Sequence, residues 1–103
     1  MRLFVMFDLP TNTAAECKAA GKFRNFLLKD GFYMMQYSIY IRICNGLEAV
    51  KKHENRVKLA VPKHGSVRIL RITEKQYSAM QILCGDAIAD LDKNYENEPI
   101  TLF

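Results

Sequence analysis

The stretch Met1-Arg2-Leu3-Phe4-Val5-Met6-Phe7-Asp8-Leu9-Pro10 is the part of the sequence that most strongly indicates the fold. Its apolar run ends at a single carboxylate, Asp8, and a proline follows two residues later. Apolar residues on both faces predict a central β-strand, over about residues 2–8, that is covered from both sides. A charge at the end of such a strand costs desolvation free energy unless another group pairs with it. Asp8 is therefore the first candidate for a functional residue.

A helix is predicted directly after this strand. Thr13 and Glu16 have the spacing of a capping box, in which each side chain accepts a hydrogen bond from the other residue's backbone N–H. The helix should extend to about Lys29 and end at Asp30-Gly31, because glycine adopts the left-handed conformation that often follows a helix. Its apolar face is expected to carry Ala19, Phe23, Phe26 and Leu27.

The middle of the chain predicts a β-hairpin. A short strand is expected over 32–35, then a tight turn or bulge at Gln36-Tyr37, and then a strand over 38–43. The second strand alternates between isoleucine and other residues. We expect its three isoleucines to face the core, and Ser38, Tyr40 and Arg42 to face outward.

The remaining pattern completes an α+β domain. It predicts a helix over about 47–60, a strand over about 66–72, a short helical turn over 74–80 capped by Thr73, and a strand over 81–84. The order βαββαβ is the ferredoxin-like arrangement, with two helices on one face of an antiparallel sheet. Residues 1–85 would form this domain, and residues 86–103 an acidic tail whose apolar end, Ile100–Phe103, adds a last edge strand. The other face of the sheet needs a cover, and a homodimer is the simplest one.

Length and composition indicate one globular domain in the cytoplasm. The chain has 103 residues, of which 50% are hydrophobic and 25% charged. No apolar run approaches the roughly 20 residues of a membrane span, and no signal peptide is visible. Cys17, Cys44 and Cys84 lack metal-binding spacing and are expected to be buried thiols, and His53 and His64 to be surface or capping residues.

The charge is distributed unevenly along the chain. Residues 1–85 contain 14 Lys and Arg against 6 Asp and Glu, a balance of +8, while residues 86–103 contain one Lys against five acids, a balance of −4. A small basic domain attracts polyanions, of which nucleic acid is the commonest in the cytosol. Solubility alone would also explain this charge.

Four segments of the chain resemble one known family. They are "MFDLP" at the end of the first strand, "KFRNFLLKDGF" at the first helix end, "QYSIYIR" in the hairpin and "VRILRITEKQY" near residue 70. In this order and spacing they resemble the smaller of the two core CRISPR adaptation proteins, a family described as CRISPR-associated endoribonucleases. The "FDLP" and "TEKQY" segments are most similar to members from type II systems. The resemblance covers about residues 2–85.

The resemblance implies a fold, a partner and an activity. Members of the family are ferredoxin-like homodimers that bind double-stranded protospacer DNA and bridge dimers of the larger integrase during spacer acquisition in prokaryotes. Many are also described as magnesium-dependent endonucleases of RNA or DNA. In those accounts the acid at the end of the first strand is the catalytic metal ligand, and that position here is Asp8.

Two interpretations of Asp8 remain open. As a ligand of Mg²⁺ it would act together with the same residue of a second chain. As a structural residue it would cap the Leu9–Thr13 turn through local backbone hydrogen bonds. Several nuclease-active members carry arginines early in the first helix, where this chain has Ala14-Ala15-Glu16-Cys17.

Two further sets of residues are candidates for intermolecular contacts. Phosphate contacts without base recognition would come from basic side chains, and the dimer interface from residues in or near strands. The alternatives to a CRISPR adaptation protein are a free-standing metal-dependent ribonuclease of the toxin type and a non-catalytic nucleic-acid-binding module. The predicted nucleic-acid contacts are Lys18, Lys22, Arg24, Arg42, Arg68, Arg71 and Lys75, and the predicted interface residues are Tyr40, Ile82 and Leu83.

Overall fold

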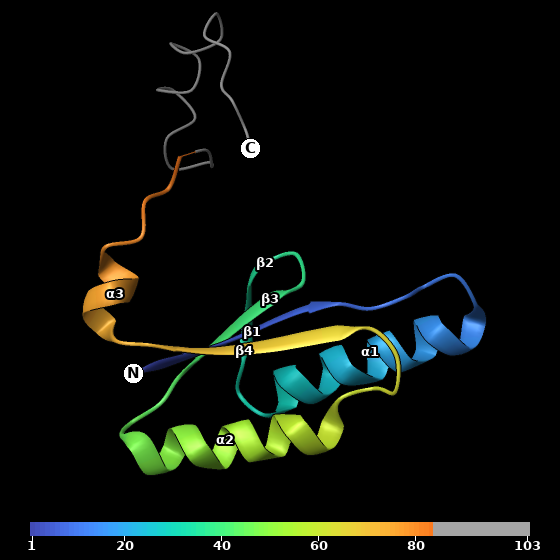
Figure 1. Ribbon diagram of the computed structural model, residues 1–103, viewed down its shortest axis with the longest axis horizontal. Coiled ribbons are helices and arrows are strands. Elements are labelled where there is room, and N and C mark those ends of the chain that lie inside the picture. Colours follow the sequence, from blue (N-terminus) through green and yellow to red (C-terminus); the bar gives the residue numbers. More distant parts are fainter. Residues whose placement is uncertain (84–103) are drawn as a thin grey trace, which may run out of the picture.

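The computed structural model describes residues 1–83 (Figure 1). These residues form one four-stranded sheet with the strand order β2-β3-β1-β4, in which every pair of neighbours is antiparallel. The predicted ferredoxin-like α+β arrangement is therefore confirmed. The elements in chain order are β1 (Arg2–Asp8), α1 (Ala14–Lys29), β2 (Tyr33–Gln36), β3 (Ile39–Ile43), α2 (Leu47–Ala60), β4 (Ser66–Ile72) and α3 (Glu74–Ser78).

Strand β1 is a central strand, as its continuous apolar run predicts. It pairs with β3 on one side and with β4 on the other. Leu3 and Val5 are fully buried, and Phe4, on the opposite face, is only 6% exposed. Both faces of β1 are thus covered where the sequence is apolar, and exposure begins at Asp8.

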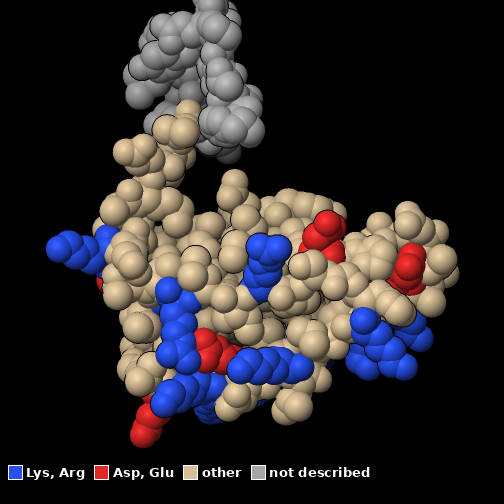
Figure 2. Space-filling model, viewed as in Figure 1, with Lys and Arg blue, Asp and Glu red and all other residues tan. Residues whose placement is uncertain are grey.

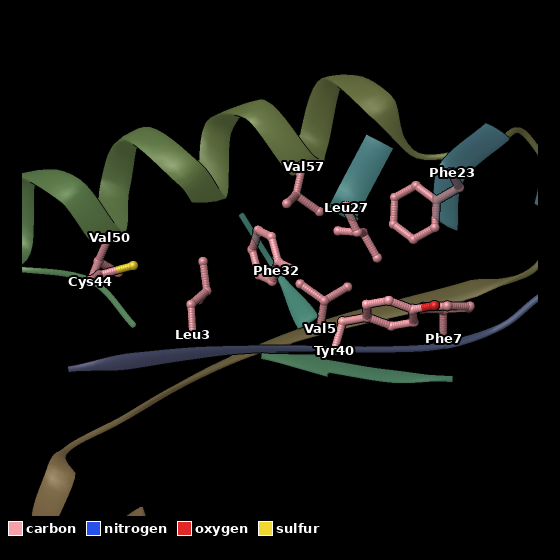
Figure 3. Packing of buried hydrophobic residues seen from close by; sticks show 10 residues of the cluster. All are labelled: Leu3, Val5, Phe7, Phe23, Leu27, Phe32, Tyr40, Cys44, Val50 and Val57. Atoms are coloured by element: carbon pink, nitrogen blue, oxygen red, sulfur yellow. The ribbon is translucent and has the colours of Figure 1, made fainter. Parts of the chain in front are cut away.

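Helices α1 and α2 cover the same face of the sheet, below it in Figure 1. Figure 3 shows Val50 and Val57 of α2 and Phe23 and Leu27 of α1 pointing toward the side chains of β1. Together these side chains fill the space between the two helices and the sheet. Phe7 packs edge-on against Phe23, with their ring centroids 5.3 Å apart. Of the predicted α1 face, Phe23 and Leu27 are buried and Phe26 packs against the core, but Ala20 is buried in place of Ala19.

The predicted orientation of β3 is wrong. Tyr40 lies opposite Val5, so it faces the helices, and it is 2% exposed. Its ring stacks on Phe7 at a centroid distance of 5.7 Å (Figure 3). The isoleucines lie on the other face, where Ile41 is opposite Phe4. An alternating pattern identifies two faces but does not say which one meets the helices, and both faces of this strand are partly covered.

The local signals at the ends of the elements are confirmed. Thr13 and Glu16 form the capping box at the start of α1, and Gly31 after its end has a φ of 91°. The β2–β3 connection contains a register shift between Met34 and Gln36, followed by a turn in which Ser38 has a φ of 65°. This is the bulge or turn that the sequence predicts at Gln36-Tyr37.

The segment after β4 differs from the prediction. Thr73 does cap a helix, α3, but residues 81–83 are not part of any strand. They are exposed and have no neighbouring strand with which to pair in the described structure. The predicted edge strand at Ile100–Phe103, and the tail 86–103 as a whole, lie outside the described residues. Within residues 1–83, no helix is long and apolar enough to cross a membrane.

Candidate functional site

Asp8 lies at the end of β1 on the sheet face opposite α1 and α2, which we call the uncovered face because neither of these two helices covers it. The alternation along β1 directs Leu3, Val5 and Phe7 toward the helices and Asp8 away from them. Asp8 is exposed, and its backbone pairs with Ser66 at the start of β4. The strand residues directed to the uncovered face are Arg2, Phe4, Met6, Asp8, Tyr33, Ile39, Ile41, Ile43, Ser66, Arg68, Leu70 and Ile72.

A shallow hollow of about 320 Å³ adjoins Asp8. Besides the carboxylate, it offers the guanidinium of Arg68, the hydroxyl of Ser66 and the phenol of Tyr37, which is 83% exposed. A carboxylate can hold a cation, and a guanidinium can hold a phosphate oxygen. The lining residues are Met6, Phe7, Asp8, Tyr37, Ser38, Ile39, Ser66 and Arg68.

The structure does not support the interpretation of Asp8 as a turn cap. Glu16 performs that role, because its Oε1 accepts hydrogen bonds from the backbone N–H groups of Asn12 at 2.9 Å and Thr13 at 3.0 Å. The Asp8 carboxylate has neither a hydrogen-bond nor a salt-bridge partner among residues 1–83. Its charge is therefore available to an external group.

One chain supplies only part of a metal site at Asp8. No group of three or more His, Cys, Asp or Glu side chains that could hold a metal ion occurs in the described part of the chain. Magnesium is commonly bound by one or two carboxylates together with substrate phosphates and waters. The exposed Asp8 carboxylate fits such an open site, but it needs ligands from another molecule.

The predicted phosphate-binding residues do not share one surface. Lys18, Lys22 and Arg24 lie on α1, Lys75 lies on α3, and only Arg68 lies on the uncovered face beside Asp8. Most basic side chains that are seen in Figure 2 lie in its lower half, over the helical layer of Figure 1. The structure thus brings one of the seven residues to the Asp8 site.

Two of these basic residues already have internal partners. Arg42 faces the helical side, and its Nη1 donates a hydrogen bond of 2.7 Å to the backbone oxygen of Asp30. Arg71 donates two hydrogen bonds of 2.6 Å to the Glu54 carboxylate on α2. These bonds lower the pKa of Glu54 and raise the pKa of Arg71.

The predicted interface residues also differ in position. Tyr40 belongs to the core beneath the helices and has no surface to offer a second chain. Ile82 and Leu83 are 62% and 70% exposed, so their side chains are accessible. The uncovered face also has exposed apolar residues: Ile43 is 53% and Leu70 is 50% exposed, whereas Phe4 and Ile41 between them are buried.

A buried polar cluster was missed by the sequence analysis. His53 was expected to be a surface or capping residue, but its Nδ1 lies 2.8 Å from Oδ2 of Asp30, and both residues are 6% exposed. Nη2 of Arg56 lies 2.8 Å from the other carboxylate oxygen, Oδ1. The spacing of Val50, His53 and Val57 places His53 on the buried stripe of α2, which was the available signal.

A second groove lies on the helical side of the molecule and differs from the Asp8 hollow in its chemistry. It has a volume of about 550 Å³ and is lined mainly by apolar residues of α1 and of the end of α2, such as Phe26 and Leu59. Its polar residues include Glu16, which is used by the capping box, and Lys63. Unlike the Asp8 hollow, the groove does not combine a free carboxylate with a guanidinium group.

Comparison with known proteins agrees with this description. The family model "CRISPR associated protein Cas2" matches residues 1–80. The protein "CRISPR-associated endoribonuclease Cas2" of Campylobacter jejuni is 46% identical over 103 residues, which cover 100% of this chain and 71% of that protein. The protein of the same name from Acidovorax ebreus is 48% identical over 85 residues, which cover 82% and 83% of the two chains.

A solved structure gives independent support for the fold. The crystal structure of Streptococcus pyogenes Cas2 at pH 6.5 superimposes with a TM-score of 0.61, covering 82% of this chain and 100% of that chain. The two sequences are 20% identical in this comparison, so the likeness concerns the fold. Together with the family match and the close relatives, it shows that the chain belongs to the Cas2 family of CRISPR-associated proteins.

Proposed function

We propose that this chain acts in CRISPR spacer acquisition as a homodimer that binds protospacer DNA and bridges dimers of the adaptation integrase. The observation that carries the proposal is the uncovered face, an apolar sheet surface in a chain of the Cas2 family. Exposed apolar area of this kind is typical of a protein interface. A second copy of the chain has the same surface and would cover it symmetrically.

The basic charge of the domain supports the DNA-binding part of the proposal. The balance of +8 over residues 1–85 favours association with a polyanion. Lys18 and Lys22 are exposed on α1 and lack partners among the described salt bridges, so they can contact phosphates. Such contacts position a duplex without reading its sequence, as a protein that accepts diverse protospacers requires.

The Asp8 hollow supports a metal-dependent phosphodiesterase activity at the dimer. Two copies of Asp8 would supply two carboxylates, and Arg68 would hold a phosphate oxygen of the substrate. When bound, Mg²⁺ supplies charge neutralisation and an activated water. The relatives named endoribonucleases support this activity, while Ala14 and Ala15 leave the start of α1 without arginine side chains.

The test is reconstitution with the adaptation integrase and a protospacer duplex. The wild-type chain should form a stable complex and support integration, and its affinity for the duplex should fall steeply with salt and change little with sequence. The Asp8→Asn variant should lose metal-dependent cleavage of RNA or DNA. It should keep its fold and its affinity for the duplex.

The scaffold role and the catalytic role would be contradicted by different results. Failure of the wild-type chain to bind both the integrase and the duplex would overturn the scaffold role. Metal-dependent RNA cleavage without integrase binding would instead identify a free-standing ribonuclease. A wild-type chain that binds nucleic acid but cleaves none with Mg²⁺ present would remove the catalytic role of Asp8.

A further inference from the structure

Gly65 lies directly against the backbone of Asp8. A Cβ atom added to Gly65 would stand 2.9 Å from the carbonyl oxygen of Asp8 and 2.7 Å from Cδ2 of Leu9. Real Cβ atoms essentially never approach other atoms this closely. Leu9 could rotate its side chain away, but the Asp8 carbonyl is backbone, so relief of that contact requires the end of β1 to move.

The pairing of β1 makes this contact more important. The ladder between β1 and β3 ends at Met6 and Ile39, whereas the ladder between β1 and β4 continues to Asp8 and Ser66. The Phe7 N–H donates a further hydrogen bond of 3.0 Å to the Ser38 carbonyl, and beyond this bond the sheet holds the end of β1 through β4. Ser66 follows Gly65 directly, so a displacement at Gly65 acts on the strand residue that fixes Asp8.

The turn after Asp8 packs on the same glycine. The added Cβ would lie 3.1 Å from Cδ of Pro10, and Gly65 has a φ of 105°, which favours glycine. Atoms of Asp8, Leu9 and Pro10 thus surround the position that a Cβ of residue 65 would occupy, so only glycine fits there without displacing them. The beginning of β4 can then approach the end of β1 closely.

We propose that Gly65 is a positioning residue for the Asp8 carboxylate: the absence of its side chain holds the end of β1 so that Asp8 points into the hollow beside Arg68. The inference deepens the proposed function, because its consequence for catalysis requires Asp8 to be the metal ligand. The placement of Asp8 itself can be measured without any activity.

The experiment compares two substitutions at Gly65 with a matched control. Gly65→Asn tolerates a positive φ better than Gly65→Ala, so it separates the steric effect from backbone strain. Gly46→Ala is the control, because Gly46 has a φ of 89° but no atom within 4 Å of an added Cβ. Both glycines have a positive φ, and an added Cβ would meet Asp8 only at Gly65.

The measurements are two-dimensional NMR of the backbone amides and titration with Mn²⁺ alone. We expect both Gly65 variants to shift the signals of Asp8 and Leu9 and to weaken Mn²⁺-dependent line broadening at Asp8, while Gly46→Ala changes neither. Metal-dependent cleavage should fall roughly 10-fold to 100-fold in the Gly65 variants, since a displacement near 1 Å can have this effect. Folding is checked by the signals of core residues such as Val50.

The outcomes distinguish this inference from the proposed function. If Gly65→Asn folds and leaves the Asp8 signals and the Mn²⁺ effect unchanged, or if Gly46→Ala changes them equally, Gly65 does not position Asp8. If the wild-type chain shows no Mn²⁺ effect at Asp8 and no cleavage, the proposed catalysis fails. In that case, shifted Asp8 signals in the Gly65 variants alone would still support the positioning role.

Discussion

Asp30 is the residue whose loss should damage the folded chain most among the described charged residues. Its carboxylate is buried and contacts both His53 and Arg56, which join the end of α1 to α2. Asp30→Ala leaves the buried imidazole without its partner, and we expect a loss of about 2–3 kcal/mol in the free energy of unfolding. Urea denaturation measures this loss.

Lys29→Ala is the control for the Asp30 experiment, because Lys29 is the exposed neighbour of Asp30 and should change the stability by less than about 0.5 kcal/mol. Arg56→Ala should have an intermediate effect, since the Arg56 side chain is 50% exposed and half solvated already. An Asp30→Ala variant as stable as Lys29→Ala would contradict the role of this cluster.

Glu54 should make the stability depend on pH. Arg71 lowers the pKa of the Glu54 carboxyl in the folded chain through two hydrogen bonds. The contribution is therefore complete above the ordinary glutamate pKa of about 4.3 and is lost as the pH falls through the lower folded value. Glu54→Gln should reduce the urea midpoint at pH 7, and the reduction should be smaller at pH 3.5.

The matched control for Glu54 is Glu48→Gln, because Glu48 is an exposed acid on the same helix and has no partner among the described salt bridges. Its substitution should leave the pH profile close to that of the wild-type chain. A Glu54→Gln effect of equal size at both pH values would show that packing, and not ionisation, is responsible.

Single residues show where sequence reasoning succeeds and where it ends. The position of Asp8 at the end of a central strand could be predicted, because the apolar run stops there. The orientation of Tyr40 could not be predicted, because an alternating pattern identifies two faces but does not say which of them meets the helices. The His53–Asp30 contact joins residues 23 positions apart, and no local pattern reports such a pairing.

At the scale of elements, α3 is held on the sheet mainly by Arg2. The Arg2 Nε donates to both Glu74 carboxylate oxygens at 3.0 and 3.1 Å, and its guanidinium lies 3.7 Å from the centroid of the Tyr77 ring. The Tyr77 ring meets Phe4 of β1 edge-on. This five-residue helix has no buried residue of its own, so its position depends on these contacts.

Arg2→Ala should therefore loosen α3 without unfolding the domain. We expect faster hydrogen exchange at the backbone amides of Tyr77 and Ala79, while the core amides of β1 keep their protection. Lys75→Ala is the control, because Lys75 is an exposed residue of the same helix. Unchanged exchange in α3 of the Arg2→Ala variant would show that other contacts hold the helix.

The elements themselves could be predicted well because their ends carry local signals. Two capping boxes, Thr13–Glu16 and Thr73–Gln76, and one glycine, Gly31, mark these ends. Each acts on backbone groups a few residues away, so the sequence pattern alone reveals it. The strand predicted over 81–84 had only an apolar pattern to support it. A strand also requires a free edge to pair with, and this is a property of the assembled sheet.

At the scale of the whole molecule, the two faces of the sheet differ in what covers them. One face is filled by α1 and α2, whereas α3 covers only part of the other (Figure 1). A sequence contains no direct record of this difference, since β1 is apolar on both faces. The apolar residues that stay exposed on the uncovered face are the physical basis for expecting a second copy there.

The dimer can be tested by placing a charge on either layer of the molecule. Leu70→Asp puts a carboxylate on the uncovered face, at a position that is 50% exposed in one chain. Burial of an unpaired charge at an interface is strongly unfavourable, so the variant should be a monomer. Leu59→Asp places the same charge on α2, where Leu59 is 89% exposed, and should leave the dimer intact.

Sedimentation velocity should give twice the 11.9 kDa of one chain for the wild type and for Leu59→Asp, and the mass of a single chain for Leu70→Asp. Dissociation by Leu59→Asp with retention of the dimer in Leu70→Asp would move the interface to the helical layer, and Asp8 would then no longer lie on the face between the two copies.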